Sequence, residues 1–193
     1  MGAVLYEDSL QQIHDGDKHA LKHEFWAAHG VTVRRTRFDG KHDVPVSFGD
    51  YYAEGSNVVV DTKANVHELM GNLGGDYRRF DHECRRAYEA GYQIVFVCEG
   101  GERLADMSTL ACVISRFCFK CRRFRSRECD PTDEQSGCAE RGKNRKPFQG
   151  YMMMGKMKTL HRKYGAEFEF VDADESAARI CELLGVKYDN QSN

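Results

Sequence analysis

The sequence lacks a long hydrophobic run and has few of the residues that mark fibrous or disordered chains. Its longest nearly apolar stretch is Ile94–Cys98, far shorter than the roughly 20 residues that a membrane-spanning helix needs. Only 3 of the 193 residues are proline, and 41% are hydrophobic, which argues against a disordered linker or a collagen-like repeat. We therefore expect a folded globular chain that does not span a membrane.

A surplus of charge of one sign is also missing. The chain has 28 Lys and Arg residues against 30 Asp and Glu, a formal net charge of −2, which excludes a uniformly basic nucleic-acid coat protein but not local basic patches. No basic segment precedes an apolar core near residue 1, so we expect no secretory signal. Eight cysteines in such a chain favour thiols or metal ligands over disulfides, and the expected compartment is reducing cytoplasm.

Hydrophobic patterning predicts one α/β domain over residues 1–193. Strands are expected at 4–8, 31–38, 46–52, 58–63, 92–98 and 167–172, and helices at 19–29, 66–90, 151–164 and 175–184. The helix at 66–90 is expected to break at Gly74–Gly75. Strands that alternate with helices predict a central mixed β-sheet flanked by helices. Residues 103–148 depart from this alternation and are predicted to form an insertion.

Four cysteines of the insertion, Cys118, Cys121, Cys129 and Cys138, have the spacing C-x2-C-x7-C-x8-C. A two-residue spacer lets both thiolates of a pair meet one tetrahedral Zn²⁺. A segment with few apolar side chains also needs the folding energy that a metal supplies. We predict structural zinc, with free thiols or a redox C-x-x-C as alternatives. The remaining cysteines lack such spacing and are expected to be buried apolar side chains: Cys84, Cys98, Cys112 and Cys181.

The insertion is also basic, with ten Lys and Arg residues against five acidic ones between residues 116 and 146. Such a concentration beside a zinc site favours contact with nucleic-acid phosphates, and a solvated face is the alternative. The residues expected to contact nucleic acid here are Arg122, Arg123, Arg125, Arg127, Lys143, Arg145 and Lys146.

Two carboxylates and a lysine form a second chemical pattern. Asp50 begins one predicted strand and Asp61 ends the next, so an antiparallel hairpin brings them to one edge. Lys63 lies two residues beyond Asp61 and therefore points to the same face of the strand. Two carboxylates suit Mg²⁺ or Mn²⁺, and a lysine can orient the attacking water of a phosphodiester hydrolysis. On spacing alone, a solvated strand end is the alternative.

Several motifs stand in a defined order. They are Glu7–Gln11, Gly49–Tyr51, Val58–Lys63, Arg79–Phe80 and Glu83. Together they resemble the nuclease domain of the XPF/Hef family of PD-(D/E)XK nucleases, whose patterns are V-D-x-R-E and G-D-x(n)-E-R-K-x-x-x-D. The resemblance covers about Val4 to Gly185, interrupted by the insertion, and implies a restriction-endonuclease-like fold.

The sequence departs from the family pattern at several positions. Asp61 replaces the Glu of E-R-K, and Thr62 replaces its Arg. His67 stands where the last Asp is expected, with Glu68 beside it. Leu10 and Gln11 replace the Arg and Glu of the first motif. No tandem helix-hairpin-helix module follows, so we expect a homodimer or a protein partner to supply further DNA contacts.

The resemblance implies a metal-dependent DNA endonuclease that cuts branched or flapped DNA. Asp50, Asp61 and the carbonyl of Thr62 are expected to bind Mg²⁺ or Mn²⁺, Asp8 to assist from the first strand, and Lys63 to position water. The alternative is a catalytically inactive, zinc-stabilised nucleic-acid-binding protein on a nuclease scaffold.

Arg79 is expected either to contact the scissile phosphate or to pair with Glu83. A small stand-alone nuclease of this kind suits a phage or a mobile element.

Overall fold

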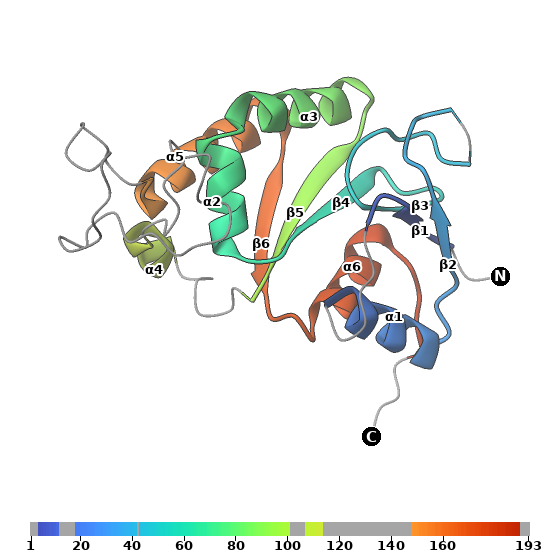
Figure 1. Cartoon of the computed structure of the whole chain (residues 1–193). Coiled ribbons are helices and arrows are strands. Elements are labelled where there is room, and N and C mark those ends of the chain that lie inside the picture. The colour runs from blue at the N-terminus through green and yellow to red at the C-terminus, as the bar shows by residue number, and fades with distance from the viewer. Residues whose placement is uncertain (1–3, 12–17, 42, 101–106, 114–147, 190–193) are drawn as a thin grey trace.

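The computed structural model of the chain describes residues 4–11, 18–41, 43–100, 107–113 and 148–189 (Figure 1). The strands are β1 (Leu5–Asp8), β2 (Val33–Thr36), β3 (Tyr51–Ala53), β4 (Val58–Lys63), β5 (Gln93–Glu99) and β6 (Glu167–Val171). The helices are α1 (Lys18–Ala28), α2 (Val66–Gly74), α3 (Tyr77–Glu89), α4 (Met107–Cys112), α5 (Gly150–Tyr164) and α6 (Ser176–Leu184).

The six strands form one mixed sheet in the order β2-β1-β3-β4-β5-β6. Strand β1 runs parallel to β2 and antiparallel to β3, and β3 runs antiparallel to β4. Strands β4, β5 and β6 are parallel neighbours. The predicted central mixed sheet is therefore confirmed.

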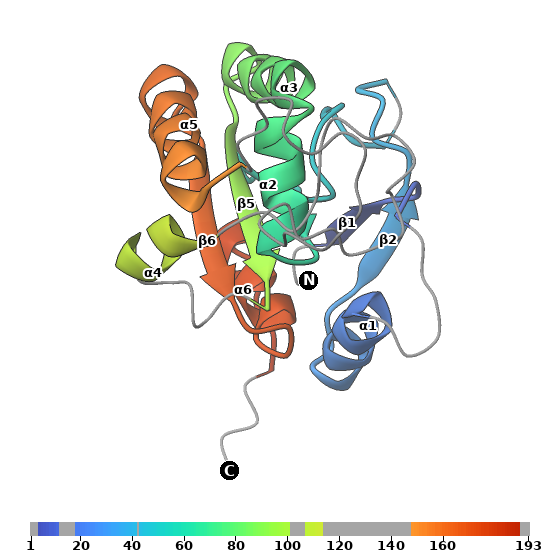
Figure 2. The ribbon, with the colours of Figure 1, turned by 60° about the vertical axis from the view of Figure 1, so that its left-hand side comes forward.

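Helices cover both faces of this sheet (Figures 1 and 2). Helices α2, α3 and α5 pack on one face around a core that includes Leu69, Phe80 and Met153. Helices α1 and α6 pack on the other around Trp26 and Ile180. No helix in the described parts of the chain is long and apolar enough to cross a membrane.

Strands β4 and β5 lie between the two helical layers and are apolar on both sides. Val59 and Phe96 belong to the core under α2 and α3, whereas Val60 and Val97 belong to the core under α1 and α6. A parallel strand buried on both faces is expected to be a nearly continuous apolar run. The polar residues at the ends of these strands are therefore held by a well-packed platform.

The helix expected at 66–90 is broken as predicted. Helix α2 begins after Asn65, whose side chain accepts hydrogen bonds from the N–H groups of His67 and Glu68. It ends at Gly74, and α3 begins at Tyr77. Glycine lowers helix propensity, so Gly74–Gly75 separates two helices that lie at an angle (Figure 1).

Strand β3 is shorter than the strand expected at 46–52. Val44, Val46 and Phe48 are buried, but they belong to a loop whose side chains fill the core under α3. Gly49 has a φ of +73°, which ends the extended conformation just before the strand. Alternating apolar residues thus mimicked a strand in the sequence.

Helix α4 was not predicted and lies within the expected insertion at 103–148. Leu110 is fully buried, and a Cβ on Gly150 would lie 1.7 Å from its carbonyl oxygen, so α4 packs directly on the start of α5. Cys112, at the end of α4, is exposed, which corrects its expected burial. The cysteines whose expected burial is confirmed are Cys84, Cys98 and Cys181.

Candidate active site

Asp50 and Asp61 lie on neighbouring antiparallel strands, as the sequence predicts. Tyr51 is paired with Val60, and continuing that register by one residue places Asp50 opposite Asp61. The N–H of Asp50 donates to the carbonyl of Val60 at 2.8 Å. The hairpin register therefore sets the spacing between the two acidic residues.

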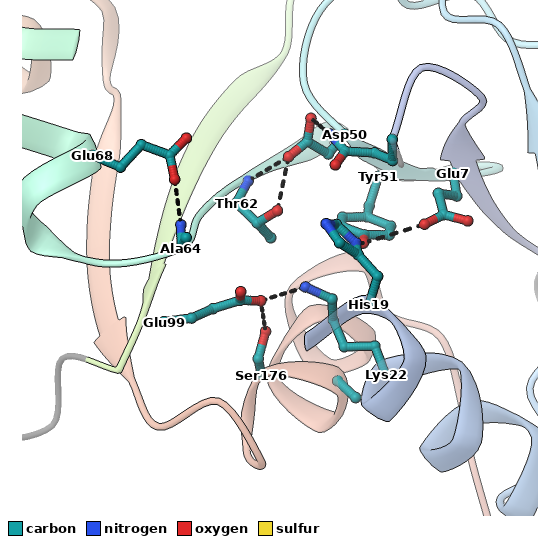
Figure 3. A network of polar contacts seen from close by, with 12 residues as sticks. Glu7, His19, Lys22, Asp50, Tyr51, Thr62, Ala64, Glu68, Glu99 and Ser176 are labelled. Atoms are coloured by element: carbon teal, nitrogen blue, oxygen red, sulfur yellow. Dashed lines mark hydrogen bonds and ion pairs between the residues drawn. The ribbon is translucent and has the colours of Figure 1, made fainter. Parts of the chain in front are cut away.

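The carboxylate of Asp50 accepts three hydrogen bonds. Its Oδ2 accepts from the backbone N–H of Thr62 at 2.7 Å and from the Thr62 hydroxyl at 2.8 Å (Figure 3). Its Oδ1 accepts from the side-chain amide of Gln11, which lies after β1. Asp50 is thus held in one orientation by two separate segments.

Gly49 allows Asp50 to approach β4 this closely. A Cβ at this position would lie 2.3 Å from Cγ1 of Val59 and 3.0 Å from the carbonyl oxygen of Val60. The positive φ of Gly49 also disfavours any other residue. Backbone geometry therefore requires glycine at position 49.

Asp61 and Lys63 form a buried ion pair on the same face of β4. Their exposed fractions are 5% and 8%, and Lys63 Nζ lies 5.8 Å from the ring centroids of both Phe80 and Phe96. Burial raises the pKa of Asp61 to about 8, with a further increase from the charge of Asp50, against the lowering effect of Lys63. Burial lowers the pKa of Lys63, but the adjacent carboxylates outweigh it and keep the amine protonated.

Glu83 adds a third carboxylate to the group. Its Oε1 accepts a hydrogen bond from the N–H of Gly49 at 3.3 Å, and its charge raises the pKa of Asp61. The sequence places Glu83 among the motifs that resemble the family and as an alternative partner of Arg79, but it predicts no contact of Glu83 with the hairpin. Its position one turn after Phe80 on the inward face of α3 is the signal that could have placed it beside the hairpin.

A second polar network, which the sequence did not predict, lies between the sheet and α1. The Tyr51 hydroxyl contacts Glu7 and His19, each at 3.5 Å (Figure 3). Lys22 pairs with Glu99, which also accepts a hydrogen bond from Ser176 at 2.7 Å (Figure 3). The residues of this network are buried, so they link α1, α6 and the ends of three strands.

Chains similar to this one among the solved structures include XPF from Aeropyrum pernix and XPF from Aeropyrum pernix in complex with DNA. Each is 17% identical in sequence, with a TM-score of 0.51, and the matches cover 98% and 95% of this chain. This chain has an XPF-like nuclease fold. It spans 66% and 64% of the two similar chains, and its sequence matches no protein-family model and no curated protein.

Asp50, Asp61 and Lys63 lie together along the β3–β4 hairpin, in the middle of the sheet. The carboxylates of Asp50, Asp61 and Glu83 influence one another, and Lys63 is the cation buried among them. No three His, Cys, Asp or Glu side chains within the described ranges converge as a metal-binding group. Mg²⁺ usually needs only one or two protein carboxylates, with water and substrate as the other ligands, so the chemistry of the Asp50 and Asp61 carboxylates suits such an ion.

Asp8 and Glu68 make structural hydrogen bonds with nearby backbone N–H groups. Asp8 Oδ1 accepts from the N–H groups of Leu10 and Phe38, at 3.2 and 3.3 Å. Glu68 accepts from the N–H of Ala64 at 2.7 Å (Figure 3). Because Asn65 caps the N–H of Glu68 in return, the Glu68 carboxylate belongs to the cap of α2.

Arg79 lies at the surface of α3, with 63% of its side chain exposed. One guanidinium nitrogen lies 3.9 Å from Glu83, and another donates to the side chain of Asn72 at 2.8 Å. An exposed pair at that distance contributes little stability, so the guanidinium can exchange Glu83 for another anion.

The expected zinc ligands and the basic residues of the insertion lie outside the described residues. The zinc ligands concerned are Cys118, Cys121, Cys129 and Cys138. The basic residues concerned are Arg122, Arg123, Arg125, Arg127, Lys143, Arg145 and Lys146.

Proposed function

We propose that the chain is a metal-dependent DNA endonuclease that hydrolyses phosphodiester bonds, with branched or flapped DNA as its substrate class. The observation that carries the proposal is the buried Asp61–Lys63 pair beside Asp50. A buried carboxylate is costly without a compensating charge, and the fold could have filled these positions with apolar residues. An XPF-like fold that retains all three groups favours phosphodiester chemistry.

Asp50, Asp61 and the carbonyl of Thr62 would hold Mg²⁺ or Mn²⁺. The bound ion would supply Lewis-acid polarisation of the phosphoryl group and lower the pKa of a water ligand. Asp8, through the turn that it stabilises after β1, would keep the neighbouring backbone in place. Because Asp50 is fixed by Thr62, the site would be formed before substrate binds.

Lys63 would hold the attacking water and balance negative charge that develops on the phosphate. Its ammonium is protonated and packed against Phe80 and Phe96, so it has a fixed position and little exposure to bulk water. Fixed charges in such an environment stabilise a transition state without reorganising. A divalent cation would also favour the ionised form of Asp61 and release Lys63 from that carboxylate.

The DNA backbone would run across the basic insertion, with structural zinc holding it beside the hairpin. One of the two similar XPF structures contains DNA, which supports DNA as the ligand. Arg79 would contact the phosphate near the site. The remaining contacts would come from Arg122, Arg123, Arg125, Arg127, Lys143, Arg145 and Lys146.

A second candidate function is DNA binding without cleavage. It is favoured by the contacts of Asp50 and Asp61, since Gln11, Thr62 and Lys63 satisfy both carboxylates within the protein. Such a site is stable without a cation. The two functions are distinguished by whether cleavage depends on these carboxylates.

The decisive experiment is cleavage of end-labelled flap, fork, splayed-arm and linear duplex DNA in Mg²⁺, Mn²⁺ or EDTA. Asp61→Asn and Lys63→Met keep side-chain size close to the original and should abolish cleavage. The matched controls are Asp81→Asn and Lys163→Met, which remove a surface ion pair of the same kind and should cut normally.

Metal-dependent cleavage that is lost only in the Asp61 and Lys63 variants supports the proposal. If all proteins shift the DNA equally and none cuts it, the binding function replaces it. Sedimentation of the chain with and without flap DNA tests the accompanying proposal of a homodimer, and a monomer in both would direct attention to a protein partner.

A further inference from the structure

Gln11 is the one side chain from outside the β3–β4 hairpin with a described hydrogen bond to the carboxylate of Asp50. Its amide nitrogen donates to Oδ1. A carboxylate donates no hydrogen bond when ionised and accepts at about four lone-pair sites. Thr62 uses two of these sites, both on Oδ2. Gln11 uses a third, on Oδ1, so a cation that binds this oxygen must share it with the Gln11 amide or displace the amide.

The position of Gln11 is fixed by the surrounding backbone. Its N–H donates to the carbonyl of Asp8 at 3.0 Å, and its own carbonyl accepts from the guanidinium of Arg35. Arg35 is in turn paired with Glu7 at 3.1 Å, and the N–H of Asp8 donates to the carbonyl of Asp50 at 2.8 Å. The turn after β1 is therefore tied to β2 and to the start of β3, and it presents the Gln11 amide to Asp50.

We propose that Gln11 is a positioning residue that sets the affinity of the site for divalent cations, by competing with the cation for Asp50 Oδ1. A neutral donor at this place stabilises Asp50 when no cation is bound and contributes no negative charge when one is. The inference rests on the proposed nuclease site. It adds that cation binding requires the Gln11 amide to share or release Oδ1.

Two substitutions separate competition from simple support. Gln11→Ala removes the competing donor and should tighten Mn²⁺ binding by about two- to fivefold. Gln11→Glu replaces the donor with a further carboxylate and should tighten binding by about tenfold or more, because ligand charge sets the affinity of oxygen sites for divalent cations. If Gln11 only supported Asp50, Gln11→Ala would instead weaken binding, so the sign of that change decides between the two roles.

The experiment titrates the whole chain with Mn²⁺ in the absence of DNA. Calorimetry and electron paramagnetic resonance of free Mn²⁺ measure the binding. Gln93→Glu is the matched control because the side chain of Gln93 bonds only to the carbonyl of Gly165 at the surface in the described contacts. The Mn²⁺ affinity of this variant should equal that of the original protein. Asp50→Asn should lose binding. Thermal unfolding in EDTA verifies that each variant is folded.

The outcomes separate this inference from the proposed function. Tighter binding in both Gln11 variants supports the inference, including the case in which only these variants bind Mn²⁺ and the original protein neither binds nor cuts. Asp50-dependent binding that is unchanged or weaker in Gln11→Ala overturns the inference, whatever Gln11→Glu does, and leaves the nuclease proposal standing. Absence of binding in every variant overturns it as well.

Discussion

Asp61 carries the largest electrostatic cost in the described site. Its carboxylate is buried beside those of Asp50 and Glu83, and Lys63 offsets only part of the resulting penalty. In the metal-free protein this raises its pKa from 3.8 to about 8. The cost at this one residue is what a bound divalent cation would relieve.

The first prediction is that metal-free stability depends on pH through Asp61. Asp61 binds its proton more tightly in the folded state than in the unfolded state. The stabilisation that comes from this difference is complete below about pH 4 and is lost as the pH rises through about 8. Asp61→Asn cannot ionise and should escape this loss. In urea unfolding with EDTA between pH 5 and 9, the free energy of unfolding of Asp61→Asn should increase relative to that of the original protein as the pH rises. Parallel curves would contradict the raised pKa.

The cysteines provide a second prediction at the scale of the residue. Burial raises the pKa of Cys181 to about 11 and also raises that of Cys84 well above its ordinary value. Reaction needs an accessible thiolate, so both should resist maleimide in the native protein, while the exposed Cys112 reacts within minutes. Peptide mass spectrometry after a timed pulse measures each site, and a denatured sample gives the full extent of labelling. Equal labelling of Cys181 and Cys112 would contradict this packing.

At the scale of the element, the β3–β4 hairpin depends on Gly49. Gly49→Ala must fit a Cβ against Val59 at positive φ, and overpacking with backbone strain should cost about 2–4 kcal/mol. Gly55→Ala is the control, since Gly55 also has a positive φ but no atom within 4 Å of the added Cβ, and should cost only about 1 kcal/mol. If both variants lose the same free energy of unfolding in chemical denaturation, the cost comes from the positive φ and not from contact of the added Cβ with β4.

Helix α2 gives a further prediction, because Glu68 accepts from Ala64 in the cap. Glu68→Ala should lower the free energy of unfolding by about 1 kcal/mol and leave Mn²⁺ affinity unchanged. Glu68→Gln, which keeps an acceptor oxygen, should restore most of that stability. A loss of Mn²⁺ binding in both variants would instead make Glu68 the functional replacement for the acidic residue absent at His67.

Local patterns in the sequence predicted most elements and the core of the site. The apolar run at 58–63 fixed β4, and the two-residue period placed Lys63 beside Asp61. The contacts of Gln11 with Asp50 and of Glu83 with Gly49 were not predictable in this way. They depend on how the turn after β1 and helix α3 cross the hairpin, which no local period encodes.

At the scale of the whole molecule, two helical layers pack on a sheet in which Asp50, Asp61 and Lys63 come from one hairpin and Asp8 from β1. The N-terminal and C-terminal parts of the chain meet at the Lys22–Glu99–Ser176 contact. Removing one member of a buried ion pair leaves the other charge uncompensated. The domain should therefore unfold as one cooperative unit, with the layers dependent on each other.

The insertion yields a prediction for the whole chain. Purified protein should contain about one zinc per chain, because four thiolates complete one tetrahedral site. Cys118→Ser should release the zinc and reduce DNA affinity, while Cys112→Ser, at an exposed thiol outside the spaced set, should do neither. Metal analysis by mass spectrometry and DNA titration measure both effects. Zinc retained in Cys118→Ser would contradict the ligand assignment.

The β3–β4 hairpin has a practical consequence for protein engineering. Its connecting residues 54–57 lie at the opposite end of the strands from Asp50 and Asp61, and the backbone ladder rather than the length of the connection keeps these two residues in register. Residues Glu54 and Gly55 are exposed. A fluorescent reporter or a circularly permuted terminus placed there should leave the spacing of the two carboxylates intact.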